Sequence, residues 1–286
     1  MGAETTTATD EDGSNDRPVV SSPVVSTPAV STKVYIASAE GDTGKSTVAL
    51  GVLSLLSATG GRVGVFRPIS RAGAGERDYL VEMLIEHASA DIDYDDCIGV
   101  TYDQVHAAPD GAIAEIVARF HAVEARCDAV VIIGSDYTDV GNPSELAYNA
   151  RVAANLAAPI ILALNASGRT PVEVRETAEH LLADIAAIHA TTAAVIANRC
   201  DPEQMSAVAA ELSRISVPTW CLPEEPVLFA PTMAELKDSL RASLYSGDPE
   251  LLDREALKVM VGGMTVEHIL ERLSEGQTLY PVDLTT

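Results

Sequence analysis

Positive charge is scarce in this chain of 286 residues. Lysine and arginine together number 19, against 42 aspartate and glutamate residues, which leaves a formal net charge of −23 at pH 7. A protein with this field repels a nucleic-acid backbone unless its basic side chains gather on one face, so we expect no nucleic-acid partner. An anionic ligand would have to be held by local donors rather than by the overall charge.

Signals for a membrane, for export and for a disulfide or zinc framework are also missing. No apolar run approaches the about 18 to 20 residues of a membrane-spanning helix, and the N-terminus lacks the pattern of a secretion signal. The cysteines form no C-x-x-C pair, and the histidines show no metal-ligand spacing. We therefore expect a cytoplasmic protein with reduced thiols and no membrane partner.

The sequence that is present divides into a tail and a long alternating region. Residues 1–32 are rich in Thr, Ser and Pro without periodicity, which predicts a disordered tail. Beyond it, apolar runs alternate with helical patterns. The expected strands are residues 34–38, 62–67, 129–134, 159–164, 193–198 and 219–222. The expected helices are residues 46–59, 79–89, 109–125, 144–157, 171–190 and 202–215.

The expected strands are apolar on both faces, as residues 130–133 and 160–162 illustrate. Strands of this kind are covered by helices on both sides, so residues 33–224 are predicted to form an α/β domain with a doubly wound, mainly parallel sheet. Ligands of such sheets bind beyond the carboxyl ends of the strands. Functional side chains are therefore expected directly after the strands.

The pattern changes after residue 224. Residues 232–246, 249–261 and 265–275 have the periodicity of helices and are separated by glycine-bearing turns. The remaining length is short for a second core. We expect residues 225–286 to be a linker followed by the truncated helical start of a second domain.

A glycine-bearing loop joins the first expected strand to the first expected helix. The loop follows the phosphate-binding pattern G-x-x-x-x-G-K-[ST], except that Ala39 stands at the first glycine position. We expect Gly41 and Gly44 to adopt positive φ, and the backbone N–H groups to surround phosphate oxygens. The candidate ligand-binding residues are Gly41, Asp42, Thr43, Gly44, Lys45, Ser46 and Thr47, with Lys45 at the phosphates and the Ser46 hydroxyl on Mg²⁺. The alternative is a plain strand–turn–helix corner with a solvated Lys45.

Several stretches of the chain resemble one known family. They are Gly-Asp-Thr-Gly-Lys-Ser-Thr at residues 41–47, Val-Phe-Arg-Pro at 65–68, Gly-Ser-Asp-Tyr-Thr-Asp at 134–139, Ala-Asn-Arg at 197–199, Pro-Glu-Glu-Pro at 223–226 and Gly-Gly-Met-Thr-Val-Glu-His-Ile-Leu at 262–270. Together they resemble the dethiobiotin-synthetase-like P-loop NTPase domain at the N-terminus of long bacterial, especially actinobacterial, phosphate acetyltransferases. The resemblance covers about residues 33–278.

The resemblance implies a place within a larger protein. In that family the P-loop domain is followed by a regulatory domain with a D-R-T-G-G signature and by a C-terminal domain that exchanges acetyl between coenzyme A and phosphate. We expect this region to bind ATP or another nucleotide with Mg²⁺, or a metabolite, as a regulatory or assembly domain. Acetyl-CoA is expected only at the C-terminal domain, which this sequence lacks, and the full-length parent is expected to be a homo-oligomer. Whether this chain is itself an enzyme stays open.

Three positions depart from, or extend, the pattern of the dethiobiotin synthetases. Those enzymes place a metal-binding glutamate where this chain has Gly134, and Asp136 could partly replace it through water or could instead cap the next turn. A lysine near the end of the second strand is replaced by Arg67, whose guanidinium can clamp a phosphate. Asn198 stands on the position that contacts adenine.

Two other functions compete with a regulatory domain. One is a stand-alone ATP- and Mg²⁺-dependent enzyme of the dethiobiotin-synthetase type, which would need an acidic ligand and a lysine at positions now held by Gly134 and Arg67. The other is a P-loop relic that serves only in oligomerisation, which Ala39 favours. Fold alone does not separate these functions.

Overall fold

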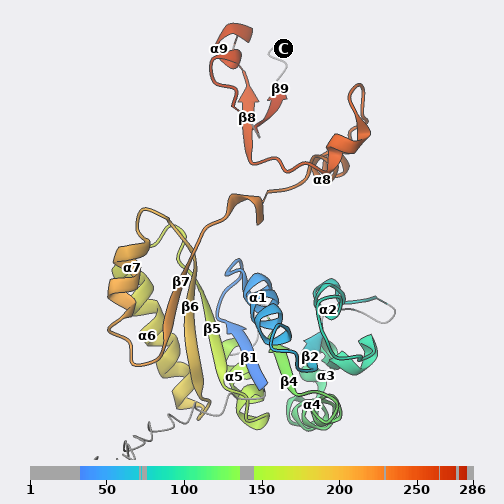
Figure 1. Ribbon diagram of the computed structural model, residues 1–286, viewed down its shortest axis with the longest axis vertical. Helices are drawn as coiled ribbons and strands as arrows, with labels where there is room; N and C mark the ends of the chain where they lie inside the picture. Colours follow the sequence, from blue (N-terminus) through green and yellow to red (C-terminus); the bar gives the residue numbers. More distant parts are fainter. Residues whose placement is uncertain are drawn as a thin grey trace, which may run out of the picture. The chain divides into compact units, whose positions relative to one another are not determined.

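The computed structural model describes residues 33–70, 72, 76–135, 145–228, 230–263, 265–274 and 277–281. Its largest element is a seven-stranded sheet in the spatial order β3-β2-β4-β1-β5-β6-β7 (Figure 1). Every neighbouring pair in this sheet is parallel, which confirms the predicted α/β fold. The strands are β1 Lys33–Ser38, β2 Val63–Ser70, β3 Ile98–Thr101, β4 Ala129–Ile133, β5 Ile160–Asn165, β6 Thr192–Cys200 and β7 Thr219–Pro223.

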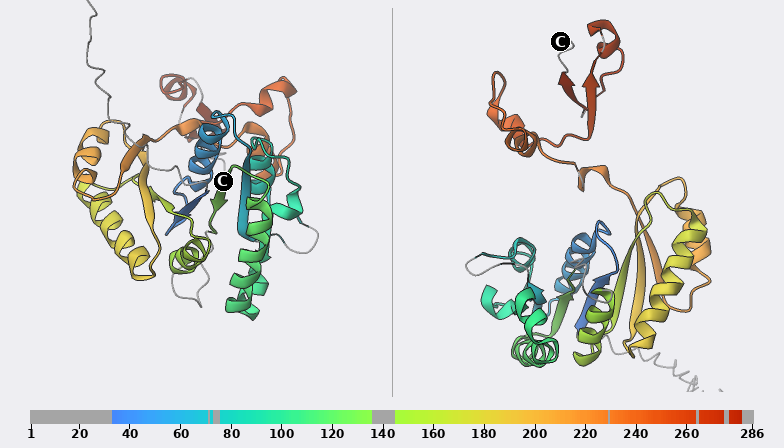
Figure 2. Two further views of the ribbon diagram at one scale, coloured as in Figure 1. Left: turned by 60° about the horizontal axis from the view of Figure 1, so that its bottom comes forward. Right: turned by 180° about the vertical axis from the view of Figure 1, so that it is seen from behind.

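Helices cover both faces of the sheet, as the continuously apolar strands predict. They are α1 Lys45–Ser57, α2 Tyr79–Ile85, α3 Tyr102–Ala107, α4 Pro109–Glu124, α5 Glu145–Asn155, α6 Pro171–Ala187 and α7 Met205–Leu212, with the 3₁₀ turn η1 at Tyr94–Cys97. Successive residues of β1 serve opposite cores: Ile36 packs in one cluster with Leu53 of α1, and Tyr35 in another with Phe120 of α4. In the left view of Figure 2, α1 (blue) and α5 (yellow-green) lie on opposite sides of the sheet.

Besides the turn η1, the alternating region holds a strand and an α-helix that the sequence pattern did not predict. Strand β3 has only four residues and includes Gly99, so it offers little of the apolar run by which strands are recognised. It nevertheless pairs in parallel with β2. Helix α3 follows it directly and is capped by the Thr101 side chain, in a reciprocal arrangement with Gln104.

The chain after β7 contains strand as well as helix. Its elements are η2 Pro226–Leu228, α8 Met233–Ser239, η3 Pro249–Asp253, β8 Lys258–Gly262, α9 Val266–Leu270 and β9 Gln277–Pro281. The predicted helix over residues 249–261 is wrong, because only its first residues form a 3₁₀ turn and its end forms β8, which pairs in parallel with β9. Strand β8 alternates two β-branched valines with other residues, and such a segment is better accommodated in a sheet than in a helix once it finds a partner strand.

Two further predictions concern the N-terminal tail and a membrane. The expected disordered tail at residues 1–32 lies outside the described residues. Among the helices that the structure describes, none combines the length and the apolar character that crossing a bilayer requires.

Candidate functional site

The glycine-bearing loop leads from β1 into α1 through a left-handed residue. Gly44 has φ 70° and ψ 27° and is the N-cap, and the helix begins at Lys45. The predicted positive φ at Gly41 is wrong, since the second left-handed residue of the loop is Asp42, with φ 54°. The first N–H groups of a helix have no partner within the helix and carry its positive end, so this loop presents donors to an anion.

The side chains of the loop differ in their exposure. Thr43 and Lys45 are only 2% and 4% exposed, whereas Gly41, Asp42 and Thr47 lie at the surface and Ser46 is half-buried. Helix α1, which the structure describes in full, has no acidic side chain in its first turn. No carboxylate of that turn therefore competes with an anionic ligand for the helix N-terminus.

Lys45 is tied to the end of β4. Its Nζ donates a hydrogen bond of 2.8 Å to the carbonyl of Ser135, the second residue after that strand. This contact and its burial contradict the alternative in which Lys45 is solvated. An ammonium group that is buried beside a helix N-terminus is placed to interact with phosphate as a point charge.

The Ser135 peptide is in turn held by Asn149 of α5, a fully buried polar side chain. Asn149 Oδ1 accepts hydrogen bonds from the Ser135 N–H at 3.0 Å and from the Tyr35 hydroxyl at 2.6 Å. Its Nδ2 donates to the carbonyls of Ser135 and Glu145, at 3.2 and 3.0 Å. Burial raises the pKa of Tyr35 far above its usual value, so this hydroxyl stays a hydrogen-bond donor. The network is neutral, buried and shielded from water.

Gly134 stands where the same network leaves no room for a side chain. A Cβ atom there would lie 2.6 Å from Asn149 Oδ1 and 2.8 Å from a ring carbon of Tyr35. Such approaches are shorter than van der Waals contact, so the glycine is required by the packing of α5 against β1. A glutamate at this position would have to displace Asn149.

Arg67 lies beside this network and is directed into the protein. Its Nη1 donates to the Gly134 carbonyl at 2.6 Å, and its Nε lies 3.4 Å from Asp78 Oδ2. The side chain is 3% exposed. Arg67 and Lys45 thus bind the adjacent carbonyls of Gly134 and Ser135, which brings two predicted ligand-binding residues to the same end of β4. These contacts occupy part of the guanidinium that was predicted to clamp a phosphate.

On the other side of the loop, Asn198 holds the backbone from the C-terminal part of β6. Its Nδ2 donates to the Thr43 carbonyl at 2.9 Å, and its side chain is 7% exposed. A Cβ atom at Gly44 would overlap with this Nδ2. Asn198 therefore contacts the glycine-bearing loop directly, and its amide nitrogen positions the loop, while its predicted contact with adenine stays a prediction.

Two arginine–carboxylate pairs complete this side. Arg169 donates to both oxygens of Glu40 at 2.7 and 2.8 Å, and the hydrogen bond from this arginine is the main cause of the lowered pKa of Glu40. Arg199 donates to Glu224 Oε1 from Nε and Nη2 at 3.0 and 2.8 Å, and its Nη1 donates to the Asp42 carbonyl at 3.0 Å. Both pairs join the loop to the ends of neighbouring strands.

The structure brings together most of the predicted site and adds to it. The loop, Lys45, Asn198 and Arg67 meet at the carboxyl ends of β1, β2, β4 and β6, whereas the predicted metal ligand Asp136 lies outside the described residues. Within the part of the chain that is described, no group of three or more His, Cys, Asp or Glu residues could hold a metal ion. Ser135, Arg199 and Glu224 lie at strand ends, where functional side chains were expected, whereas the sequence prediction did not single out Glu40, Asn149 or Arg169. Only Asn149 carries a local signal, as a polar residue on the apolar stripe of its helix.

Comparison with known proteins identifies a domain family and relatives that include two phosphate acetyltransferases. A model of the AAA domain family matches residues 32–232. A phosphate acetyltransferase of Synechocystis sp. is 28% identical over 256 residues, which are 86% of this chain and 37% of that protein. A phosphate acetyltransferase of Nitratidesulfovibrio vulgaris is 25% identical over 258 residues, 85% of this chain and 36% of that protein. The chain thus spans little more than a third of the length of these curated relatives.

Solved structures with a similar fold include two bacterial proteins. A chain of the MinC:MinD cell division protein complex of Aquifex aeolicus gives a TM-score of 0.45 at 14% identity, over 69% of this chain and 83% of that one. A complex of a Cyanothece McdA variant with ATP gives a TM-score of 0.43 at 16% identity, over 77% of this chain and 92% of that one.

Proposed function

The chain belongs to the AAA domain family, and from this premise we propose that residues 39–47 bind the phosphate groups of a nucleotide together with Mg²⁺. The observation that carries the proposal is the local geometry: the left-handed Gly44 starts a helix whose first residue is a buried lysine. Phosphate oxygens fit such a site because backbone N–H groups and one ammonium meet there.

The candidate positions for Mg²⁺ ligands differ in how well they suit the ion. Ser46 lies in the first turn of α1 and would supply a hydroxyl ligand to Mg²⁺, which keeps several waters and takes few protein ligands. When bound, the ion would neutralise charge on the phosphates. A carboxylate ligand at Gly134 does not fit, because Asn149 and Tyr35 fill the space that its side chain would need. Asp136 stays a candidate for a ligand that acts through water.

We further propose that this region is the N-terminal part of a phosphate acetyltransferase, in which it acts as a nucleotide- or metabolite-binding regulatory or assembly domain. The names of the two relatives and their alignment over 86% and 85% of this chain support this assignment. The overall reaction would convert acetyl-CoA and phosphate into acetyl phosphate and CoA. We assign acetyl transfer, and acetyl-CoA binding, to sequence outside the shared region. We also propose that the complete protein is a cytoplasmic homo-oligomer.

The surroundings of Gly134 and Arg67 disfavour a stand-alone enzyme of the dethiobiotin-synthetase type. Such an enzyme would need a metal-binding carboxylate at position 134, where the hydrogen-bonded side chains of Tyr35 and Asn149 leave no room for a side chain. It would also need a lysine at position 67, where this chain has Arg67, which is buried and bonded to the Gly134 carbonyl. Binding without transfer is therefore the function that these residues support best.

The test is calorimetric titration with ATP and ADP, each with and without Mg²⁺, and with acetyl-CoA as a control. We expect Mg²⁺-dependent binding of ATP and no binding of acetyl-CoA. Lys45→Met, which keeps the apolar stem, should weaken ATP binding by a factor of about ten to about 150, the ~1.5–3 kcal/mol of one charge-assisted contact. Lys237→Met, at a lysine of α8, should leave the affinity unchanged.

Two results would contradict the proposal. One is silence of the wild-type protein towards every nucleotide, which would favour the P-loop relic. The other is equal ATP affinity of the wild type and Lys45→Met, provided that thermal unfolding shows the variant to be folded.

A further inference from the structure

Arg199 joins the phosphate-binding loop to the point where the chain leaves the seven-stranded sheet. One arm of its guanidinium donates to the Asp42 carbonyl at 3.0 Å, while Nε and Nη2 both donate to Glu224 Oε1. The arginine and glutamate side chains are 19% and 34% exposed, so the pair is partly shielded from water. A single side chain therefore contacts the loop and the residue that follows β7.

The two residues joined by the hydrogen bond from Arg199 to the loop both have unusual backbone conformations. Asp42 and Arg199 are non-glycine residues in the left-handed region, with φ of 54° and 58°. Such residues persist only where their surroundings hold them, and they concentrate at ligand-binding and switch regions. Here the two left-handed residues are hydrogen-bonded to each other, so a change in the backbone at Asp42 acts directly on Arg199.

Glu224 is bonded to the sheet at the start of the connection to α8. Its N–H donates to the Cys200 carbonyl at 2.9 Å, which extends the pairing of β6 with β7 by one step. Its second carboxylate oxygen accepts a longer hydrogen bond, of 3.5 Å, from the Ser167 hydroxyl. The chain then enters η2, where Leu228 N–H donates back to the Glu225 carbonyl. Glu224 is thus positioned to determine how firmly residues 225–228 are held.

We propose that the Asp42–Arg199–Glu224 chain of hydrogen bonds couples occupancy of the phosphate-binding loop to the order of residues 225–228. The proposal rests on the proposed nucleotide site and concerns its regulation. A bound phosphate fixes the loop backbone, the Asp42 carbonyl then holds Arg199, and Arg199 holds Glu224. Because coupling between two sites is reciprocal, weakening the hold on Glu224 also loosens the loop.

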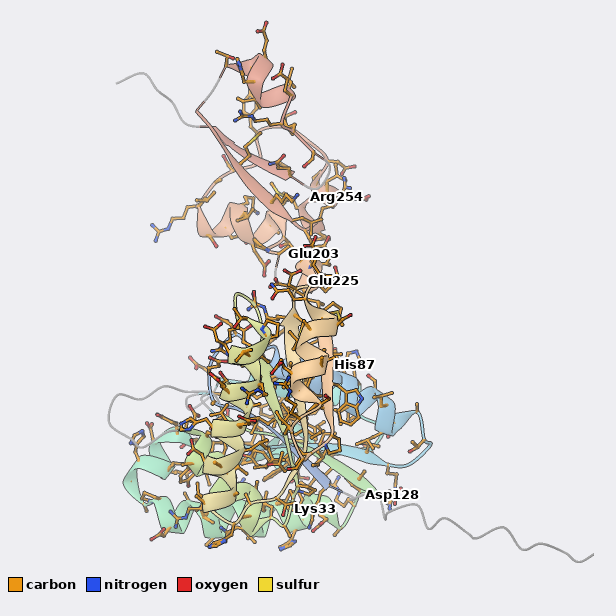
Figure 3. All side chains as sticks on the ribbon, turned by 90° about the vertical axis from the view of Figure 1, so that its left-hand side faces the viewer. Lys33, His87, Asp128, Glu203, Glu225 and Arg254 are labelled. Atoms are coloured by element: carbon orange, nitrogen blue, oxygen red, sulfur yellow. The ribbon has the colours of Figure 1, made fainter. Side chains whose placement is uncertain are left out.

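A second arginine–carboxylate pair in the same domain supplies the control. Arg62 donates to Asp128 from Nε and Nη2, at 3.3 and 3.0 Å, but this pair precedes β2 and β4 instead of following a strand. Figure 3 shows Asp128 and Glu225 at opposite ends of the domain. Asp128→Asn therefore removes a carboxylate with a similar partner and no path to the loop.

The experiment compares amide hydrogen exchange in the wild type, Glu224→Gln and Asp128→Asn, each with and without Mg²⁺ and ATP. Without nucleotide, Glu224→Gln should speed exchange at Asp42 and Thr43 about threefold to tenfold, the effect of a weakened charge-assisted hydrogen bond that is partly exposed. In the wild type, ATP should slow exchange of the amides of residues 225, 227 and 228 by a similar factor. Glu224→Gln should lose that response, and Asp128→Asn should keep it.

The outcomes separate the coupling from the nucleotide site itself. Calorimetric binding of ATP with no change in exchange at residues 225–228 would overturn the coupling and leave the proposed nucleotide site intact. Unchanged exchange of the loop in nucleotide-free Glu224→Gln would overturn the coupling whether or not ATP binds. Absence of ATP binding by the wild type would overturn both. Arg199→Lys, which keeps the charge but cannot bridge both partners, should give an intermediate response.

Discussion

The two sides of the phosphate-binding loop are built from different kinds of interaction. On the β4 side, Lys45 reaches the Ser135 carbonyl, which belongs to a neutral network around the fully buried Asn149. On the β6 side, the loop is joined to the strand ends by the pairs of Arg169 with Glu40 and Arg199 with Glu224, whose side chains are 19% to 36% exposed. The β4 side is therefore buried away from water, whereas the β6 side is partly exposed to it.

The two sides nevertheless share one device, an asparagine packed against a glycine. Asn149 occupies the space that a side chain at Gly134 would need, and Asn198 does the same at Gly44. In each case the amide approaches the backbone closely enough to bond to a carbonyl, that of Ser135 or that of Thr43. The glycines therefore allow close approach by a hydrogen-bonding side chain.

The difference between the sides predicts different costs of disruption. A buried hydrogen-bonding group that loses its partner keeps its full desolvation penalty, whereas an exposed ion pair contributes little because water and salt screen it. We infer that the β4 side sets the geometry of the loop rigidly. The β6 side is the part that a ligand can adjust at low cost, and this is where the coupling to residues 225–228 is proposed.

The largest expected effect is the loss of Asn149. Asn149→Ala leaves the Tyr35 hydroxyl and the Ser135 N–H buried without their acceptor, so we expect the free energy of unfolding to fall by about 3–5 kcal/mol. Urea denaturation measures it. Asn155→Ala, at an exposed position of the same helix, should cost less than about 1 kcal/mol. Tyr35→Phe should cost less in the Asn149→Ala background than in the wild type, and equal costs would contradict the network.

A smaller loss is expected at Gly44, on the β6 side. Gly44→Ala places a Cβ against Asn198 and forces alanine into a left-handed conformation, at a cost of about 2–3 kcal/mol in unfolding free energy. It should also weaken ATP binding, since the helix start is displaced. Gly41→Ala is the matched control, because nothing lies within 4 Å of its Cβ position and its φ is not positive. Equal stability of the two variants would refute this account of the loop.

Gly134→Ala tests the packing of the β4 side without the backbone strain of Gly44→Ala. Its φ is not positive, so Gly134→Ala suffers only from the contacts with Asn149 and Tyr35, and overpacking of this kind costs about 1–3 kcal/mol. Chemical denaturation again gives the value. Gly51→Ala, in open space within α1, should instead stabilise the protein by roughly 0.5–1 kcal/mol. A neutral Gly134→Ala would show that a side chain fits and would reopen the possibility of a carboxylate ligand there.

The smallest expected effect concerns Glu40, and it depends on pH. Arg169 lowers the pKa of Glu40 in the folded state below its ordinary value of 4.5, so the contribution to stability is present above that value and disappears as the pH falls through the folded pKa. Because the pair is about one-third exposed, Glu40→Gln should cost only about 0.5 kcal/mol at pH 7, and this cost should decrease as the pH falls towards and below the folded pKa of Glu40. Unfolding curves of both proteins at pH 7 and at a series of lower pH values check this. A cost that persists at low pH would contradict the ion pair as its source.

The sequence predicted the sheet and the loop well because both are encoded locally. Apolar runs identified six of the seven strands, and the Gly-Lys-Ser pattern identified the start of α1. The missed strand β3 is short, and the wrong helix over residues 249–261 contains a segment that becomes a strand only by pairing with β9. Strand formation that depends on a distant partner is invisible to a local periodicity.

Local sequence patterns were sufficient to specify the α/β architecture, the phosphate-binding loop and the lysine at its end, because each depends on neighbouring residues. What surrounds the loop was decided by tertiary structure alone. Lys45 and Ser135 are 90 positions apart, Glu40 and Arg169 are 129 apart, and Asp42 and Arg199 are 157 apart. Parallel strands bring all their carboxyl ends to one edge of the sheet, whatever their order in the chain, and only that arrangement joins these residues into one site.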